Sequence, residues 1–484
     1  MYYKSTRKIG HKISSKEAII KGLSYDGGLL FAEKIPKLSL KSLSYQDFAF
    51  GVLKVFFDDF SDGELIHAIE NAYDEKFDDE RITPLIKTKD AFILELFHGK
   101  TSAFKDLALS ILPYLMTIAK GSLNIRKKIA ILTATSGDTG KAALEGFKNV
   151  DGTEVFVFYP ADGISEIQKK QMITQDGENV HIFGINGNFD DAQNAVKKIF
   201  EDKDFNKKMS ENGYILSSAN SINIGRLFPQ IIYYFYAYNL LLEEREIVNG
   251  EKINITVPTG NFGNILAAYI AKKMSLPIDK LIIASNKNKI LTDFFNTGTY
   301  DTNREFFITN SPSMDILISS NLERLLYFLF DEKMVKKSMD LLKRTGKFEI
   351  PKEIAKEKFI DFYANFSDED RTLKTIKKVY KENNYLIDTH TAVGYSVYLD
   401  YKEKTKDKKK TIIAGTASPY KFPQAISYAL GISDGNEDDY TLLRKIHEKT
   451  SVKIPDNLKN LDKKKIRHGR IIEKEEIKAV ILSE

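Results

Sequence analysis

One lysine of this 484-residue chain stands in a setting that suits covalent chemistry. Lys105 lies in the segment Thr101-Ser-Ala-Phe-Lys-Asp106, which precedes an apolar helical stretch through Leu115. Small and aromatic neighbours favour desolvation of the amine, which lowers its pKa and frees it to form a Schiff base. Most lysines are nevertheless surface residues, so this segment by itself leaves a reactive amine and an ordinary surface residue as alternatives.

A glycine-rich loop follows the β-branched run from Lys128 to Thr135 and precedes a helical pattern. The small side chains of Ser136-Gly-Asp-Thr-Gly140 leave backbone amides open to an anion, most simply a substrate carboxylate. The alternative is an ordinary helix start with Ser136 or Thr139 as the N-cap. The loop alone does not decide between these two interpretations.

Two further loops have the same arrangement of strand, glycine and helix. Pro258-Thr-Gly-Asn-Phe-Gly-Asn264 follows the run 253–257, and its glycines Gly260 and Gly263 let the backbone curl around a phosphate at a helix N-terminus. Its spacing fits neither the dinucleotide fingerprint nor a P-loop. Gly415-Thr-Ala-Ser-Pro419 follows the run 411–414, and its threonine is either a ligand donor or an ordinary turn residue. Ligands of open α/β sheets bind where strands end in this way.

Two α/β layers are needed to bring these loops together. Short apolar runs alternate with helical patterns, which predicts βαβ units and parallel sheets. The first ninety or so residues mix short amphipathic helices with turn signals, as in an added domain, and the polar, helical sequence after Gly431 is typical of a tail or lid. The predicted strands cover residues 128–135, 154–159, 179–183, 253–257, 281–284 and 411–414.

Composition excludes several classes of site and partner. The chain has no cysteine, which excludes disulfides, thiolate nucleophiles and cysteine-based metal centres, and no two of its 7 histidines have the i, i+4 spacing of a helical zinc site. A formal charge of +5, with acids interspersed, gives no indication of nucleic acid as a partner. No apolar run approaches the length of a membrane span and no secretory signal is visible, so we expect a cytoplasmic protein without a membrane partner.

Six ordered motifs together resemble the threonine synthase family, whose members are pyridoxal-phosphate enzymes with the tryptophan-synthase-β fold. The resemblance runs nearly from end to end of the chain. The matching segments are Phe97–Asp106 (FHGKTSAFKD), Thr135–Gly140 (TSGDTG), Asn220–Arg226 (NSINIGR), Val257–Asn264 (VPTGNFGN), Asp388–Gly394 (DTHTAVG) and Thr416–Phe422 (TASPYKF). Residues 22–31 and 311–316 also fit the family.

The resemblance implies a fold and a division of the chain. The implied fold is α/β, a two-lobed fold type II with parallel-rich sheets, an added N-terminal domain and a helical C-terminal tail. The implied divisions are an N-terminal domain over residues 1–92, a catalytic unit over residues 93–430 whose smaller lobe spans about 128–220, and a tail over residues 431–484.

The resemblance also implies roles around pyridoxal 5'-phosphate. Lys105 would hold the cofactor covalently and act as the catalytic base. Asp138 would lie near the phenolic oxygen of the cofactor, and Thr416 would face its pyridine nitrogen as a neutral hydroxyl. The implied ligands of the cofactor phosphate are Gly260, Asn261, Phe262, Gly263 and Asn264; those of the substrate are Ser136 and Thr139 for the carboxylate, and Asn220, Ser221, Asn223 and Arg226 for the phosphate.

The implied reaction converts O-phospho-L-homoserine and water into L-threonine and phosphate by β,γ-elimination and replacement. The alternative is a phospho-lyase of similar sequence that releases 2-oxobutyrate, ammonia and phosphate, because both reactions need Lys105 and Arg226. A cofactor-binding protein that has lost catalysis is a third interpretation. We expect a monomer or a homodimer that acts on this small-molecule substrate.

Several residues depart from the motifs of the family. Lys100 and Lys141 add positive charge near the predicted anion site, where they either tighten phosphate binding or face solvent. Ser418 replaces a histidine, which removes an imidazole and puts any role of that group in doubt. The other departures are Ser102, Asn264 and Lys289.

Overall fold

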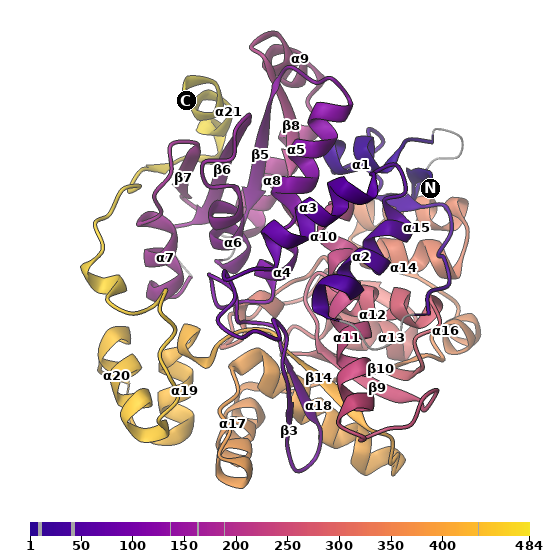
Figure 1. Ribbon diagram of the computed structural model, residues 1–484, viewed down its shortest axis with the longest axis vertical. Helices are drawn as coiled ribbons and strands as arrows, with labels where there is room; N and C mark the ends of the chain where they lie inside the picture. The colour runs from indigo at the N-terminus through magenta and orange to yellow at the C-terminus, as the bar shows by residue number, and fades with distance from the viewer. Residues whose placement is uncertain (8–11, 40–43, 136, 162–163, 188, 434) are drawn as a thin grey trace.

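Two parallel-rich sheets organise the chain in the computed structural model of this protein. The structure describes residues 1–7, 12–39, 44–135, 137–161, 164–187, 189–433 and 435–484. The smaller sheet lies in the upper half of Figure 1 and the larger sheet in the lower half, where strands from distant parts of the chain meet. The predicted α/β class with parallel-rich sheets is confirmed.

The larger sheet is covered by helices on both faces. It consists, in spatial order, of β13 (Phe362–Phe366), β10 (Ile278–Ser285), β9 (Ile253–Pro258), β14 (Thr411–Gly415), β4 (Phe92–Glu95) and β3 (Leu85–Lys87), and only β3 is antiparallel to its neighbour. Ile412 and Ala414 point into the core shared with α11 (Pro229–Glu243) and α12 (Gly263–Lys273), whereas Ile413 points into the core shared with α18 (Thr389–Thr405). Burial on both faces explains why these strands have continuous apolar sequences.

The smaller sheet is entirely parallel. It consists, in spatial order, of β15 (Ile471–Ile472), β7 (Val180–Ile185), β6 (Thr153–Pro160), β5 (Lys128–Ala134) and β8 (Tyr214–Ser218). Ile129 and Ile131 face the core that includes α6 (Asp138–Phe147), whereas Ala130 and Leu132 face that of α8 (Phe189–Glu201), α9 (Lys203–Glu211) and α21 (Ile477–Ser483). The C-terminal tail therefore contributes a strand, which its polar sequence did not predict.

The N-terminal helices share one capping signal. Helices α1 (Ser15–Lys21), α2 (Tyr45–Phe56) and α3 (Asp62–Ala72) each begin after a serine whose hydroxyl caps the helix, with an acidic residue three positions later that binds back. They lie beside the antiparallel pair β1 (Tyr3–Ser5) and β2 (Leu30–Ala32). Helix α2 packs on α11, and β3 belongs to the larger sheet, so the segment before residue 92 shares its core with the rest of the chain.

The remaining elements connect the sheets and enclose the loops between them. The helices are α4 (Lys105–Leu109), α5 (Leu112–Ser122), α7 (Glu166–Ile173), α10 (Ile224–Leu227), α13 (Ile290–Thr297), α14 (Leu322–Leu329), α15 (Glu332–Thr345), α16 (Lys352–Lys358), α17 (Glu369–Asn383), α19 (Pro423–Leu430) and α20 (Asp439–Thr450). The short elements are β11 (Thr299–Asp301), β12 (Lys347–Glu349) and the 3-10 turns η1 (Pro312–Met314), η2 (Pro419–Lys421), η3 (Leu461–Lys463) and η4 (Lys474–Glu476).

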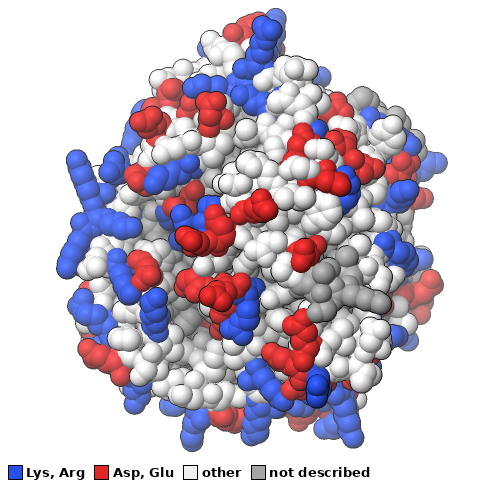
Figure 2. All heavy atoms as spheres, viewed as in Figure 1, with Lys and Arg blue, Asp and Glu red and all other residues white. Residues whose placement is uncertain are grey.

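The outer surface has mixed charge on the face seen in Figure 2, where Lys and Arg are interspersed with Asp and Glu. Within the described part of the chain, no helix has both the length and the apolar character that a bilayer span needs. The same residues contain no group of three or more His, Asp or Glu side chains arranged to hold a metal ion. A functional site is therefore expected at the strand ends between the two sheets, where open α/β sheets bind ligands.

Candidate functional site

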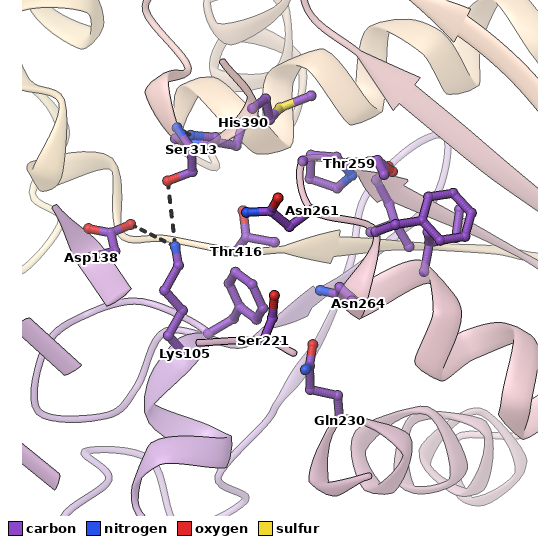
Figure 3. A pocket seen from close by; sticks show the side chains of 18 of the residues that line it. Lys105, Asp138, Ser221, Gln230, Thr259, Asn261, Asn264, Ser313, His390 and Thr416 are labelled. Atoms are coloured by element: carbon purple, nitrogen blue, oxygen red, sulfur yellow. Dashed lines mark hydrogen bonds and ion pairs between the residues drawn. The ribbon is translucent and has the colours of Figure 1, made fainter. Parts of the chain in front are cut away.

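A pocket lies where the ends of β9 and β14 meet the starts of α4, α6 and α12. Small ligands typically bind in such hollows, where a few polar side chains converge. The side chains in Figure 3 point into it from both halves of the molecule. The predicted site residues that line it are Lys105, Asp138, Thr139, Ser221, Arg226, Gly260, Asn261, Phe262, Gly263, Asn264 and Thr416.

Lys105 is the first residue of α4 and is only 8% exposed. Its Nζ lies 3.3 Å from Oδ2 of Asp138 and 3.5 Å from Oγ of Ser313 (Figure 3). Burial lowers the pKa of the Lys105 amine below its ordinary value, although the carboxylate of Asp138 acts in the opposite direction. The structure thus contains the desolvated amine that the sequence left as one of two alternatives.

The loop before α6 is held by the side chain of Thr135, and the N-cap residue itself is a glycine. The helix begins after Gly137, whose φ of 136° suits glycine, and the hydroxyl of Thr135 accepts from the N–H groups of Gly137 at 3.0 Å and Gly140 at 2.9 Å. Thr139 lies inside the helix, so its interpretation as an N-cap is wrong. Ser136, the other candidate, lies outside the described residues.

Asp138 bridges two lysines at the start of α6. Its Oδ2 faces Lys105, while its Oδ1 lies 2.7 Å from Nζ of Lys421 and accepts a 2.8 Å hydrogen bond from Gln168. Burial by itself would raise the pKa of Asp138, but Lys421 and, when it is protonated, Lys105 outweigh it and hold that pKa far below its usual range. Asp138 is therefore an anion at neutral pH.

The loop that ends β9 forms an anion cradle. Helix α12 starts without a side-chain cap, and among the described residues its first-turn N–H groups have no other acceptor, so they can bind a ligand. Phe262, not a glycine, takes the left-handed conformation at its N-cap, with φ of 64°, and its ring stacks on Phe295. Gly260 instead allows the backbone of Ser313 to pack closely against the loop, because a Cβ at position 260 would lie 2.4 Å from the carbonyl oxygen of Ser313. The expectation that both glycines provide the curl is thus corrected.

Two asparagines of this loop keep polar atoms free. Oδ1 of Asn261 and Nδ2 of Asn264 are buried and have no hydrogen-bond partner among the described residues. The hydroxyl of Tyr234 donates to Oδ1 of Asn264, which orients the amide group of that side chain. Unpaired buried polar groups are rare in proteins unless a ligand completes them.

Arg226 is a buried cation at the same pocket. It lies in α10, is 2% exposed and donates from Nη1 to the carbonyl of Ala219, while its Nε has no partner among the described residues. None of the ion pairs among the described residues includes the guanidinium of Arg226. Burial lowers the pKa of Arg226 to about 10, which still leaves it charged at neutral pH.

The chain matches three family descriptions in order along its length. Residues 2–73 match Threonine synthase N terminus, residues 77–416 match Pyridoxal-phosphate dependent enzyme and residues 391–481 match Threonine synthase, C-terminal. The threonine synthase of Saccharomyces cerevisiae is 38% identical over 465 residues, which cover 88% of this chain and 89% of that protein. The chain belongs to the threonine synthase family.

Solved structures of the threonine synthase family have the same fold. The yeast threonine synthase superimposes with a TM-score of 0.88 at 36% identity, covering 99% of this chain and 98% of that one. A pyridoxal-phosphate-bound threonine synthase from Brucella melitensis gives a TM-score of 0.86 at 35% identity with the same coverage. The human protein named Threonine synthase-like 1 is 41% identical over 449 residues, which cover 88% of this chain and 60% of that protein.

The pocket fits the cofactor of the threonine synthase family, pyridoxal 5'-phosphate. The cofactor has an aldehyde for an amine, a phosphate for backbone N–H groups and a flat ring between them. The buried Lys105 supplies the amine, and the uncapped start of α12 with the unpaired Asn264 supplies hydrogen-bond donors. The residues present therefore match the chemistry of the group.

Two of the described residues implied as ligands do not line the pocket. Asn223 is fully buried and donates to the carbonyls of Ile19 and Ser218, while its Oδ1 accepts from Gly225 and caps α10. Its amide is thus occupied by backbone groups and orients the helix of Arg226, while the substrate contact implied for it stays a prediction.

Asn220 has a similar supporting role. Its side chain donates to the carbonyl of Ala134 at 3.2 Å, which ties the turn after β8 to the end of β5. Asn220 does not line the pocket, and the substrate contact implied for it stays a prediction.

Sequence reasoning gave no role to several residues that line or support this site of the threonine synthase fold. His390 accepts from the N–H of Ser313 and pairs with Asp388 at 3.0 Å, which fixes the loop beside Lys105. Asp388, His390 and Lys421 lie in the motifs quoted above, and Ser313 lies in the segment 311–316. Their place in segments that resemble the family could therefore have indicated that they belong to the site. Gln230, which lines the pocket from α11, lies outside every motif.

The departures from the threonine synthase motifs have local explanations. Lys141 forms an ion pair with Glu145 at 3.1 Å and a hydrogen bond with Gln175, so its charge is balanced within the smaller lobe. Lys100 is exposed. Ser418 caps the turn η2, where its Oγ accepts from the N–H of Tyr420.

Two more departures make contacts outside the pocket. Ser102 donates to Asn457 in the tail, and Lys289 lies 4.0 Å from Asp293. Neither residue lines the pocket.

His98, in the segment that leads to Lys105, lies between two carboxylates. Its ring nitrogens are 2.6 Å from Asp78 and 2.8 Å from Glu95. Burial would lower the pKa of His98, but these two acids outweigh it and raise the pKa to about 9. The imidazolium therefore ties the approach to α4 to the end of β4.

Proposed function

We propose that this chain converts O-phospho-L-homoserine and water into L-threonine and phosphate with pyridoxal 5'-phosphate. One observation carries the proposal: a single pocket holds a desolvated lysine, Lys105, and a buried guanidinium, Arg226, that has no carboxylate partner among the described residues. The first suits an aldehyde cofactor and the second a substrate phosphate. The names of the relatives agree with this reaction.

The cofactor would be held by the residues that surround Lys105. We assign its phosphate to the backbone of Gly260 to Asn264, because the start of α12 offers free N–H groups and a favourable dipole. Thr416 is 7% exposed and lines the pocket at the end of β14, where a neutral hydroxyl suits the ring nitrogen. Asp138 is assigned to the neighbourhood of the phenolic oxygen, on the side of Lys105.

Proton transfer at the substrate is assigned to Lys105. When bound, the cofactor supplies an electron-withdrawing group that makes a proton on the carbon next to the substrate amine removable. Lys105 is buried and its pKa is lowered, so its Nζ can be neutral and accept that proton. Lys105 as a residue is only 8% exposed, which limits the access of water to this step.

Departure of the phosphate is assigned to Arg226. A guanidinium presents a planar fork of N–H groups that matches two phosphate oxygens, and Nε of Arg226 is free to provide part of that fork. Ser221 lines the same part of the pocket, and Thr139, with Ser136, is assigned to the substrate carboxylate. The guanidinium would stabilise the charge that grows on the leaving group.

The deciding experiment is a product assay. Purified protein loaded with pyridoxal 5'-phosphate is given O-phosphohomoserine, and threonine, 2-oxobutyrate and phosphate are quantified. We expect threonine and phosphate in equal amounts. Mainly 2-oxobutyrate would instead establish the phospho-lyase, which remains the alternative because its chemistry uses the same Lys105 and Arg226.

A spectroscopic test separates an enzyme from a binding protein without catalysis. The protein should acquire visible absorption when the cofactor joins Lys105, and a Lys105→Ala variant should not. A wild-type protein that stays colourless with added cofactor would argue against the enzyme. The cytoplasmic location and the monomeric or homodimeric state stay predictions, which fractionation and size-exclusion chromatography can test.

A further inference from the structure

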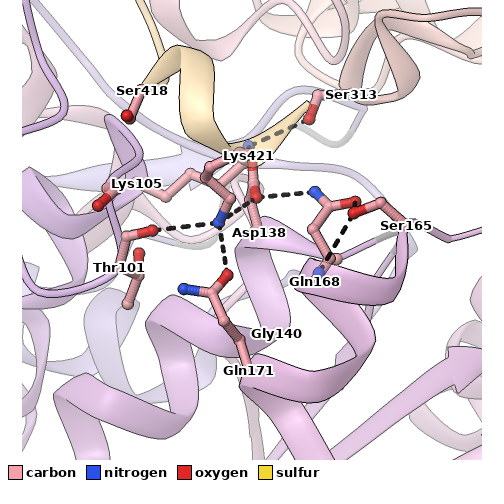
Figure 4. Close-up of polar contacts among 12 residues, drawn as sticks. Thr101, Lys105, Asp138, Gly140, Ser165, Gln168, Gln171, Ser313, Ser418 and Lys421 are labelled. Atoms are coloured by element: carbon pink, nitrogen blue, oxygen red, sulfur yellow. Dashed lines mark hydrogen bonds and ion pairs between the residues drawn. The ribbon is translucent and has the colours of Figure 1, made fainter. Parts of the chain in front are cut away.

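A second lysine lies beside the proposed cofactor lysine and is fully buried. Lys421, at the end of η2, is 0% exposed. Its Nζ lies 2.7 Å from Oδ1 of Asp138 and donates to the carbonyl of Thr101 at 3.1 Å and to Oε1 of Gln171 at 2.9 Å (Figure 4). Lys421 is not part of the pocket lining, whereas its partner Asp138 is.

The two oxygens of Asp138 are used differently. Oδ1 receives Lys421 and, at 2.8 Å, Nε2 of Gln168, while Oδ2 faces Lys105 at 3.3 Å. Donors from η2 and α7 therefore fix the carboxylate from behind, as Figure 4 shows, and leave one oxygen toward the reactive amine. The contact to Lys421 is the shorter of the two lysine contacts.

Charge balance gives this arrangement a consequence. A buried carboxylate next to a single buried lysine would hold that lysine as a cation, because each ion compensates the other in a medium of low polarity. A cationic Lys105 is not a nucleophile. Asp138, however, faces two amines. Its negative charge is balanced by Lys421, the closer of the two, so Lys105 does not have to carry a positive charge.

We propose that Lys421 is a positioning residue that neutralises Asp138 so that Lys105 can exist as a free amine. The inference rests on the proposed function only in that Lys105 is taken as the cofactor lysine. The charged groups that act on this cluster are Asp138, Lys421, Arg226 and Asp106. Lys421 and Arg226 both disfavour the cationic form of Lys105, and the effect of Lys421 is the larger of the two.

The test measures the protonation of Lys105 directly. The full chain without cofactor is treated with a trace of amine-acylating reagent across a pH series, and labelling of the Lys105 peptide is followed by mass spectrometry. In Lys421→Met the midpoint should rise by about one pH unit or more, which is about tenfold fewer free amines at neutral pH. Lys421→Arg should restore most of the wild-type midpoint.

A matched control removes another buried lysine that pairs with one acid. Lys16 is 8% exposed, pairs with Glu64 at 3.1 Å and does not line the pocket. Lys16→Met should leave the Lys105 midpoint unchanged. A folded Lys421→Met protein, checked by circular dichroism, with the wild-type Lys105 midpoint would overturn the proposal.

A second comparison decides the matter if Lys421→Met does not fold. The double variant Asp138→Asn, Lys421→Met removes the anion and its neutralising cation together, so its Lys105 midpoint should stay close to that of the wild type. A midpoint that falls by about one pH unit or more would show that Asp138 acts on Lys105 without being neutralised by Lys421 and would overturn the proposal. Labelling does not depend on which product the enzyme makes, so a failure here and a failure of the product assay can be told apart.

Discussion

Arg324 offers the sharpest test of how the N-terminal segment supports the site. It is fully buried in α14, and its Nε and Nη2 donate to the carbonyl of Leu30 in β2 at 3.1 and 2.8 Å. Nη2 also donates to the carbonyl of Ile222, in the segment that leads to Arg226, and Nη1 to Oδ1 of Asn321. One guanidinium thus joins the N-terminal sheet to the proposed substrate loop.

Arg324→Met should destabilise the protein and loosen that loop. The carbonyls of Leu30 and Ile222 would lose these donors, and a buried group left unsatisfied costs about 1–3 kcal/mol. Removal of a desolvated charge offsets part of this sum, so we expect a net loss of about 2–4 kcal/mol in the free energy of unfolding. The KM for O-phosphohomoserine should rise, whereas cofactor affinity should change little.

Urea unfolding and steady-state kinetics measure the two effects. The matched control is Arg371→Met, because Arg371 pairs with Asp400 at 2.7 Å with 40% of its side chain exposed and should contribute less than about 1 kcal/mol. If Arg324→Met unfolds at the same urea concentration as the control and keeps the wild-type KM, the bridging role assigned to Arg324 is refuted.

Three further outcomes follow from the geometry. Arg226→Ala should lower kcat/KM for the phosphorylated substrate by about 10²-fold, with cofactor affinity nearly unchanged, and an equal loss of both would show a structural role instead. The pKa of His98, about 9, exceeds its unfolded value of about 6.5, so its stabilisation, on the order of 2 kcal/mol, is complete below the lower value and lost as pH rises through the higher one. His98→Gln should flatten thermal stability over that range, and an unchanged slope would contradict this. Gly260→Ala should weaken cofactor binding at least about tenfold, whereas Gly63→Ala, with open space around its Cβ, should stabilise by about 0.5–1 kcal/mol in thermal unfolding. Unaltered cofactor affinity in Gly260→Ala would show that the loop tolerates the contact between the new Cβ and the carbonyl of Ser313.

The sequence predicted strands best where both faces of a strand are buried. The runs at 128–135, 154–159 and 253–257 lie on β5, β6 and β9, because strands covered on both sides need continuous apolar residues. The strand β15, of only two residues, depends on pairing with β7, and no local pattern could indicate it. Strand β13 at the sheet edge has mostly half-buried residues and was likewise missed.

The site was predictable where chemistry depends on local sequence. Glycine loops and a lysine among small residues mark strand ends and a desolvated amine, and Lys105, Asp138 and Arg226 do line one pocket. What local sequence could not show is which polar atoms are already used. Asn223 and Arg226 lie three residues apart in one motif, yet the amide of Asn223 is occupied by backbone groups and Nε of Arg226 is free.

Hydrogen-bond satisfaction also separates the two buried arginines. Arg226 and Arg324 are both at most 2% exposed, burial lowers the pKa of each, and neither has an ion pair among the described residues. Arg324 directs Nε, Nη1 and Nη2 at protein oxygens, so it can hold elements together but has little left for a ligand. Arg226 keeps Nε unpaired at the wall of the pocket, which costs stability without an anion and favours binding of one. Residue type, charge and burial are the same in both, so the unmet donor is what favours Arg226 as the proposed ligand of the substrate phosphate.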